Sequence, residues 1–126
     1  MDYLQRDIAQ CPRVAVYGTL KRGQRNHHRL GDATHLGHDY LTALTLYDLG
    51  PYPGAKLTTS RGALVEVYVI NSEQLALLDQ LEECCHHAPL AGTYHRAVFK
   101  TRYGTAWSYL YNPDVQEEAR IQDGVW

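Results

Sequence analysis

The sequence predicts an α+β domain with a mostly antiparallel or mixed sheet. Several short segments show the alternation of apolar and polar residues that is typical of half-buried strands, and one segment after residue 70 has clear helical spacing. Strands gathered in this way, without a regular succession of strand and helix, favour an α+β fold over a doubly wound parallel sheet. Because sheets of many short strands often curl towards closure, which removes exposed edges, we expect a strongly curled sheet.

Length and composition indicate one domain. The chain has 126 residues, of which 44% are apolar and 21% charged, and these values exclude wholesale disorder. No internal repeat or linker divides it. We therefore expect a single domain over residues 1–126, with a core at about 13–112 and a polar, acidic tail at 113–126.

The first elements follow from short apolar runs. Residues 13–17 read as a buried strand that Gly18 ends, and residues 24–30 as one or two helical turns. Alternation predicts a strand at 40–49. The sequence Gly-Pro-Tyr-Pro-Gly at 50–54 should end that strand, because two prolines and two glycines interrupt a hydrogen-bonded ladder.

The second half begins with the clearest strand and the clearest helix. Residues 62–70 form the strand, with one apolar face made of Ala63, Val65, Val67 and Val69. Asn71 or Ser72 should cap the helix that follows. Its inner side carries four residues at helical spacing, with two leucines as the adjacent stripe: Leu75, Leu78, Asp79 and Glu82, then Leu77 and Leu81.

After an irregular loop at 84–93, the sequence predicts a hairpin. Residues 94–103 and 105–111 both alternate, and Gly104 lies between them. Arg96 on the first arm is expected to pair with Asp79 or Glu82.

Charge and composition exclude several classes of partner. A formal net charge of −2 gives no attraction to nucleic acid or to an anionic membrane. No apolar run approaches the roughly 20 residues of a membrane span, and residues 1–12 lack the apolar region of a signal peptide. Three cysteines, two of them adjacent, do not make a secreted disulfide framework, so we expect a cytoplasmic protein.

Clusters of histidine, cysteine and basic residues do not predict a further site. The pairs His27-His28, Cys84-Cys85 and His86-His87 lack the spacing of metal motifs, and a nucleophile at either cysteine of the second pair has no supporting signature. The basic residues Lys21, Arg22, Arg25 and Arg29 have no interleaved aromatic platform for nucleic acid. They are interpreted as a solvated face or as a rim that attracts an anionic substrate.

The turn after the first strand is the most informative segment. Gly18 allows the backbone to turn sharply and to approach a ligand, and successive N–H groups in such a turn can form a site for a carboxylate or a phosphate. Gly18 and Gly23 have the glycine spacing of a phosphate-binding P-loop, but Gln24 and Arg25 follow where that motif needs Lys and Ser or Thr, so we reject it. A purely structural turn remains the alternative.

A set of motifs in order resembles the γ-glutamyl cyclotransferase-like family. The first is Val-Ala-Val-Tyr-Gly-Thr-Leu-Lys-Arg-Gly-Gln at 14–24, followed by Asn-His-His at 26–28. The turn at 50–54 and the Gly-x-x-x-Glu-Val-Tyr strand at 62–68 come next. Leu-Asp-x-x-Glu at 78–82, Tyr-x-Arg at 94–96 and the strand at 106–111 complete the series. The resemblance covers about residues 14–111.

The resemblance implies a fold, which is a small mixed β-barrel with flanking helices, and it also implies a chemical reaction. Backbone donors of Tyr17, Gly18, Thr19 and Leu20 would hold the α-carboxylate of a small γ-glutamyl substrate, and Glu82 would be the general acid/base. The substrate's own α-amine attacks its γ-carbonyl, which releases an amine and closes 5-oxoproline without a metal or another cofactor. Tyr111 is expected to line the pocket, with Tyr109 as the alternative, and a monomer or a weak homo-oligomer is expected.

The choice of Glu82 also rests on its own position. Helical spacing places it on the side of Leu78 and Asp79, at the margin of the core, where burial would raise the pKa of a carboxyl group. Glu83 is its only close rival, whereas Glu66 lies in a strand opposite the apolar face and is expected to be structural.

The loop at 83–92 departs from the family pattern, so the preferred substrate does not follow from the resemblance. Two alternatives stay open. One is a non-catalytic small-molecule binding module of the same fold, and the other is an enzyme that uses Glu82 on a different acyl compound.

Overall fold

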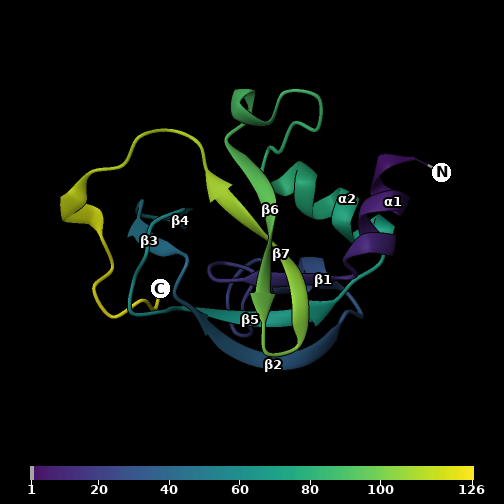
Figure 1. Cartoon of the computed structure of the whole chain (residues 1–126), viewed down its shortest axis with the longest axis horizontal. Coiled ribbons are helices and arrows are strands. Elements are labelled where there is room, and N and C mark those ends of the chain that lie inside the picture. Colours follow the sequence, from purple (N-terminus) through teal and green to yellow (C-terminus); the bar gives the residue numbers. More distant parts are fainter. Residues whose placement is uncertain (1) are drawn as a thin grey trace.

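The structure of this chain is a computed structural model that describes residues 2–126, and a five-stranded sheet lies at its centre (Figure 1). In chain order the elements are α1 (Tyr3–Gln10), β1 (Arg13–Val16), β2 (Thr34–Leu41), β3 (Thr45–Asp48), β4 (Pro53–Lys56), β5 (Ala63–Val69), α2 (Ser72–Leu81), β6 (Tyr94–Thr101) and β7 (Gly104–Tyr111). Short 3₁₀ turns lie at His27–Leu30, Pro89–Ala91 and Glu117–Ala119.

The central sheet is mixed, as the sequence predicted. Its strand order is β2-β5-β1-β7-β6, and β1 pairs in parallel with β7, while the other neighbours are antiparallel. Strands β3 and β4 form a separate two-stranded sheet. The strand at 13–17, the strand at 62–70 and the hairpin about Gly104 are confirmed within one or two residues at their ends.

The expected barrel is wrong, because the sheet does not close. Strands β2 and β6 are its two edges and do not pair with each other. The β3–β4 hairpin does not bridge them, since β3 pairs only with β4 and, through Tyr47, with Arg120 of the C-terminal segment.

The single strand expected at 40–49 is also wrong. Strand β2 ends at Leu41 and β3 begins at Thr45, with a turn between them. The sequence at 50–54 does end a strand, but Pro53 also begins β4, where a proline is tolerated because the first residue of a strand need not donate to the ladder. The two strands form a hairpin, which the bond from the Leu49 amide to the Tyr52 carbonyl closes (3.1 Å).

Two hydrophobic clusters lie on opposite faces of the sheet. In β1, Val14 and Val16 face the cluster under α2, while Ala15 faces the cluster under the β3–β4 hairpin. Three residues of β5 belong to the cluster under the β3–β4 hairpin, as expected: Ala63, Val65 and Val67. Val69, by contrast, is 37% exposed and falls outside that cluster. The central strands thus carry apolar residues on both faces because both faces are covered.

Helix α2 has the predicted cap and most of the predicted inner face. The Asn71 side chain accepts a hydrogen bond from the Gln74 backbone amide, and the Gln74 side chain accepts one from the Asn71 backbone amide. Leu75, Leu78 and Asp79 are buried, whereas Leu77 is 55% exposed, so the stripe expected at Leu77 is wrong.

Helix α1 was not predicted. Asp2 caps it through a capping box with Gln5, and it lies beside α2 at one end of the molecule, opposite the β3–β4 hairpin (Figure 1). None of its residues is fully buried, but Leu4 and Ile8, which lie one helical turn apart, pack against the core. Among the helices of residues 2–126, none is long and apolar enough to cross a membrane.

Candidate active site

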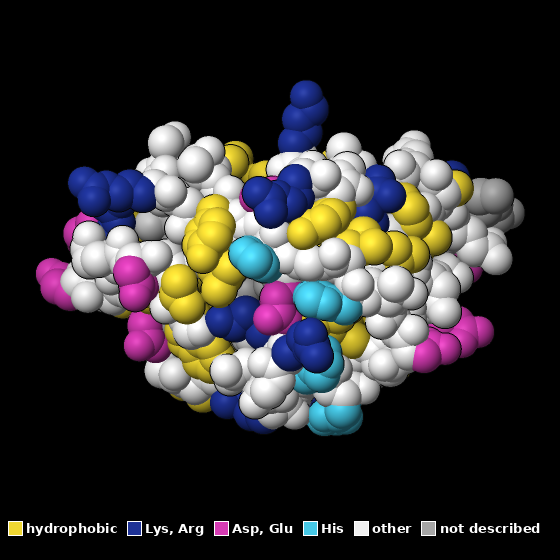
Figure 2. All heavy atoms as spheres, turned by 90° about the horizontal axis from the view of Figure 1, so that it is seen from below, with side chains coloured by type: hydrophobic (Ala, Val, Ile, Leu, Met, Phe, Trp, Pro, Cys, Tyr) yellow, Lys and Arg dark blue, Asp and Glu magenta, His cyan; other side chains and the backbone are white. Residues whose placement is uncertain are grey.

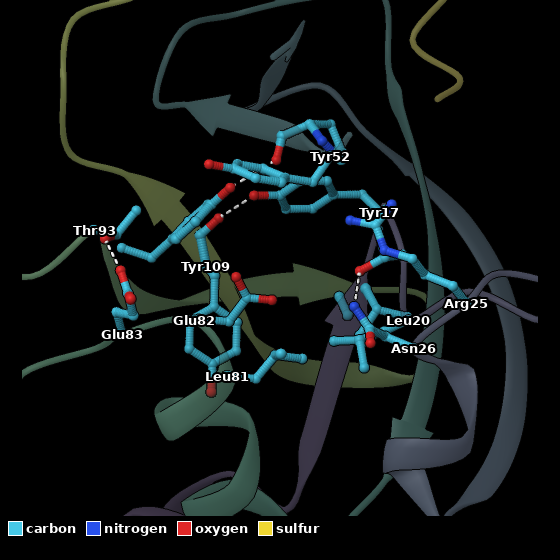
Figure 3. Close-up of a pocket in the computed structure, with 16 residues that line it drawn as sticks. Tyr17, Leu20, Arg25, Asn26, Tyr52, Leu81, Glu82, Glu83, Thr93 and Tyr109 are labelled. Carbon is cyan, nitrogen blue, oxygen red and sulfur yellow. Dashed lines mark hydrogen bonds between the residues drawn. The ribbon is translucent and has the colours of Figure 1, made fainter. Parts of the chain in front are cut away.

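A cavity of about 270 Å³ opens where the turn after β1 meets the end of α2 (Figure 3). Its wall includes the four residues of the turn on one side and Glu82 on the other: Tyr17, Gly18, Thr19, Leu20 and Glu82. The structure therefore brings together the turn and the carboxylate that the sequence placed far apart in the chain.

The end of α2 positions Glu82. Its amide donates to the Leu78 carbonyl (2.9 Å), so the residue still belongs to the last helical turn. Glu83 then takes a positive φ of 51°, which ends the helix and sends the chain away. Figure 3 shows the Glu82 carboxylate pointing into the cavity, on the side towards Tyr17.

Burial raises the pKa of Glu82 to about 7. No cation opposes this effect: within residues 2–126, the Glu82 carboxylate makes no ion pair and no side-chain hydrogen bond. Two tyrosine hydroxyls lie near Glu82, but neither donates a hydrogen bond that would lower its pKa. Tyr17 donates to the Tyr109 carbonyl (2.6 Å) and Tyr94 donates to the Pro53 carbonyl (2.8 Å). A carboxyl group that titrates near neutrality can both take and give a proton.

The turn opposite Glu82 presents backbone donors. In the part of the chain that the structure describes, no backbone or side-chain acceptor is bonded to the amides of Gly18, Thr19 or Leu20. All three residues are buried. Successive free N–H groups in a concave turn bind anions, and a carboxylate is a suitable guest.

Two contacts hold this turn in place. The Asn26 side chain donates to the Thr19 hydroxyl (2.9 Å), and the Asn26 amide donates to the Thr19 carbonyl (2.9 Å). Gly18 packs so closely that a Cβ there would lie 2.7 Å from the ring of Pro53. Glu66 braces the next residues by accepting from the Arg22 amide (2.8 Å), which agrees with the structural role expected for it.

Beneath Glu82, a buried polar network ties α2 to the sheet. Arg96 donates two hydrogen bonds to Asp79 (2.8 and 3.0 Å) and one to Asp7 of α1 (2.9 Å). The Tyr109 hydroxyl also donates to Asp79 (2.6 Å). Of the two partners expected for Arg96, the structure selects Asp79 and leaves Glu82 unpaired.

Tyr111 does not line the cavity, and the wall position expected for it belongs to Tyr109. Both side chains lie on the same face of β7, but Tyr111 is one pleat further along the strand. Its ring lies edge-on to that of Tyr94, with centroids 5.2 Å apart, and Tyr94 separates it from the cavity.

Several wall residues were not predicted as site residues from the sequence, although Arg25 was named in the basic cluster interpreted as a possible rim. Tyr52, Thr93, Tyr94, Arg25 and Asn26 all line the cavity. Tyr94 belongs to the Tyr-x-Arg motif. Its place two residues before Arg96, on the same face of the strand, is the sequence signal that could have identified it. Tyr52 comes from the turn of the β3–β4 hairpin, whose position over the site depends on tertiary packing.

The cysteine and histidine clusters stay outside the site. Burial raises the pKa of the Cys84 thiol to about 11, which disfavours the thiolate that a nucleophile requires. Histidines gather among charged side chains on the face seen in Figure 2. From Asp2 to Trp126, no group of three His, Cys, Asp or Glu residues is placed to hold a metal ion.

Fold and site together define a small α+β protein in which a turn with unpaired backbone amides and an unpaired carboxylate line one cavity. The family model for γ-glutamyl cyclotransferases of the AIG2-like type matches residues 14–126. The chain is 37% identical to the γ-glutamylcyclotransferase family protein YtfP of Escherichia coli K12, over 115 residues that cover 90% of this chain and 95% of YtfP. The protein therefore belongs to the AIG2-like γ-glutamyl cyclotransferase family.

Solved structures agree with this assignment. The solution structure of E. coli YtfP has a TM-score of 0.67 at 35% identity and covers 90% of this chain and 95% of YtfP. An uncharacterized protein of Pyrococcus horikoshii has a TM-score of 0.73 at 26% identity, with 90% of this chain and 87% of that chain covered. Helix α1 lies outside the residues that the family model matches.

Proposed function

We propose that this protein is a γ-glutamyl cyclotransferase that converts a small γ-glutamyl compound into 5-oxoproline and a free amine. The observation that carries the proposal is the unpaired Glu82 carboxylate, with its pKa near 7, across the cavity from the three free amides of the turn. The cavity is slightly smaller than the roughly 300–1,000 Å³ usual for ligand sites, which suits a substrate as small as a γ-glutamyl group.

In this mechanism the amides of Gly18, Thr19 and Leu20 bind the α-carboxylate of the substrate. Glu82, as the carboxylate, takes a proton from the α-ammonium group. The freed nitrogen attacks the γ-carbonyl carbon and forms the new C–N bond of the five-membered ring. The bond to the leaving nitrogen then breaks as Glu82 returns this proton to that nitrogen. The attacking nitrogen also loses a second proton through Glu82 to the released amine, which leaves as an ammonium ion, so the ring nitrogen of 5-oxoproline keeps one proton. Atoms and protons balance, and one carboxylate serves as base and then as acid.

Proximity supplies much of the rate in such a reaction. Amine and carbonyl belong to one molecule, so the protein has only to hold the substrate curled. An anion-binding turn at one wall and a proton carrier at the other are sufficient for this task. Two relatives support the same chemistry by their names: a γ-L-glutamyl-butirosin B γ-glutamyl cyclotransferase of Niallia circulans, 34% identical, and a zebrafish γ-glutamylaminecyclotransferase A, also 34% identical.

A product assay tests the proposal. Purified protein is incubated with a panel of γ-glutamyl amino acids, γ-glutamyl amines and γ-glutamyl peptides, and 5-oxoproline is measured by mass spectrometry. We expect 5-oxoproline and the free amine in equal amounts from at least one compound. If the whole panel binds at the turn and yields no 5-oxoproline, the proposal fails and a binding module becomes the better account.

A further inference from the structure

Arg25 supplies the positive charge on the cavity wall. Three charged side chains line the cavity, and the other two are Glu82 and Glu83. Figure 3 shows the Arg25 guanidinium beside Tyr17, on the side of the drawn residues away from Glu82. Over residues 2–126, the Arg25 side chain makes no ion pair and no hydrogen bond. A cation on a cavity wall without a partner is available to a ligand.

The position of Arg25 is fixed by its neighbour. Asn26 is bonded to Thr19 through both its amide and its side chain, and Arg29 donates to the Asn26 side-chain oxygen (3.0 Å). The backbone at residue 25 is therefore tied to the anion-binding turn. The exposed side chain of Arg25 therefore starts from a fixed point beside the site, and its guanidinium is free to meet a ligand.

Burial separates two places where an anion can bind. The turn residues Gly18, Thr19 and Leu20 are buried, whereas Arg25 is exposed and lies at the rim. A substrate whose α-carboxylate is held by the turn and whose γ-carbonyl lies near Glu82 must direct its leaving group towards the rim. This division leaves the exposed Arg25 available to the leaving group, whereas the buried turn is available to the γ-glutamyl part.

The acidic side chain at the rim is already engaged. The Glu83 carboxylate accepts a hydrogen bond from the Thr93 hydroxyl, and the Thr93 amide donates to the Glu83 carbonyl (3.1 Å). Of the two opposite charges at the rim, the positive one is free. A neutral hydroxyl does not cancel the charge of Glu83, so the preference rests on the unpaired donors of Arg25, which suit a leaving group with a negative charge.

We propose that Arg25 binds a carboxylate on the leaving group, so that the preferred substrates are γ-glutamyl amino acids or peptides rather than simple γ-glutamyl amines. A guanidinium matches a carboxylate with two parallel N–H donors, and this geometry gives specificity as well as affinity. The proposal rests on the proposed function, because it assigns the leaving group of that reaction.

A pair of substrates that differ only in the carboxylate tests the proposal: γ-glutamylalanine and γ-glutamylethylamine. Arg25→Gln removes the charge, and Arg22→Gln is the matched control, since Arg22 is an exposed residue of the same basic cluster that does not line the cavity. We expect Arg25→Gln to lower kcat/KM about tenfold for γ-glutamylalanine, the effect of losing one charge-assisted hydrogen bond, and to leave γ-glutamylethylamine unchanged. Arg22→Gln should change neither value.

Two results would overturn the assignment of Arg25. An equal loss for both substrates would mean that Arg25 serves the γ-glutamyl part or the fold, and no loss for either would mean that it does not contact the leaving group. Binding to the inactive Glu82→Gln protein, measured by calorimetry, keeps the test independent of turnover. In that background, Arg25→Gln should weaken the binding of γ-glutamylalanine about tenfold and leave the binding of γ-glutamylethylamine unchanged. Absence of 5-oxoproline from the wild type would count against the proposed function alone.

Discussion

Asp79 and Glu82 lie three residues apart at the end of α2, and their carboxylates have opposite surroundings. Asp79 accepts two hydrogen bonds from Arg96 and one from Tyr109, and it is buried. Glu82 has neither a cation nor a donor in the described part of the chain, and its pKa rises to about 7. One carboxylate is thus paired within a structural network, and the other has no partner among the described residues.

The unpaired state of Glu82 should make the folded protein less stable at neutral pH. Because the folded protein holds the Glu82 proton more tightly than the unfolded chain does, stability falls as pH rises from about 4.5 to about 7 and stays reduced above that. We expect Glu82→Gln to exceed the wild type by about 1–3 kcal/mol in free energy of unfolding at pH 8, and the difference to vanish near pH 4. Denaturant titrations at several pH values measure it.

Glu83→Gln is the matched control for this prediction. Glu83 is the neighbouring carboxyl group but is exposed, so Glu83→Gln separates the effect of burial from that of removing a negative charge at this end of α2. A Glu82→Gln protein that follows the wild type at every pH would show that burial does not perturb the Glu82 carboxyl.

The rate should depend on the same titration. Glu82 must be a carboxylate to take the proton from the α-ammonium group, and burial keeps it protonated until about pH 7. We therefore expect kcat/KM to fall as pH is lowered through about 7, with one proton taken up. A profile whose acidic limb lies near pH 4.5, the ordinary range of a glutamate, would contradict the environment described for this group.

The network around Asp79 should be a large contributor to stability. Asp79→Ala leaves the buried Arg96 guanidinium short of its main partner, and loss of one partner of a buried pair costs about 3–5 kcal/mol. Glu117→Ala removes an exposed pair with Arg120 (3.6 Å) and should cost less than about 1 kcal/mol. Equal effects of the two variants in chemical denaturation would show that burial of the Asp79 pair is unimportant.

Gly18 should be required for the shape of the anion-binding turn. A Cβ at this position would lie 2.7 Å from the Pro53 ring, so Gly18→Ala must displace the turn and its free amides. We expect KM to rise about tenfold or more, the effect of losing one charge-assisted hydrogen bond, while kcat changes less.

Gly23→Ala provides the comparison for Gly18→Ala. A Cβ at Gly23 meets nothing within 4 Å, but the residue has a positive φ of 83°, so the change should lower stability rather than affinity. If Gly18→Ala bound substrate normally, the turn would not be the carboxylate site.

Elements that depend on local signals were predictable from the sequence. The cap at Asn71, the phase of α2 and the apolar alternation of β5 lie within single segments, and they placed Glu82 at the margin of the core. The position of Tyr109 rather than Tyr111 on the cavity wall was not predictable, because it depends on how the sheet and Tyr94 pack together.

Closure of the sheet was not predictable either, because it depends on pairing between β2 and β6, which are far apart in the chain. Helix α1 is a different case, because its capping box of Asp2 and Gln5 and the apolar pair Leu4 and Ile8 are local signals that were missed. It buries none of its residues fully, and the bond between Asp7 and Arg96 joins residues 89 positions apart. Interactions of this range leave no periodic signal in the sequence around them.

The most direct test of the account compares turnover and binding in Glu82→Gln with those in Glu83→Gln, using whichever γ-glutamyl compound the wild type converts fastest. We expect Glu82→Gln to lose 5-oxoproline formation by a factor of about 10²–10⁴, the usual contribution of a general acid/base, and to bind the compound as tightly as the wild type. Glu83→Gln should keep most of the activity. Full turnover by Glu82→Gln would contradict the central claim that this carboxylate carries the proton.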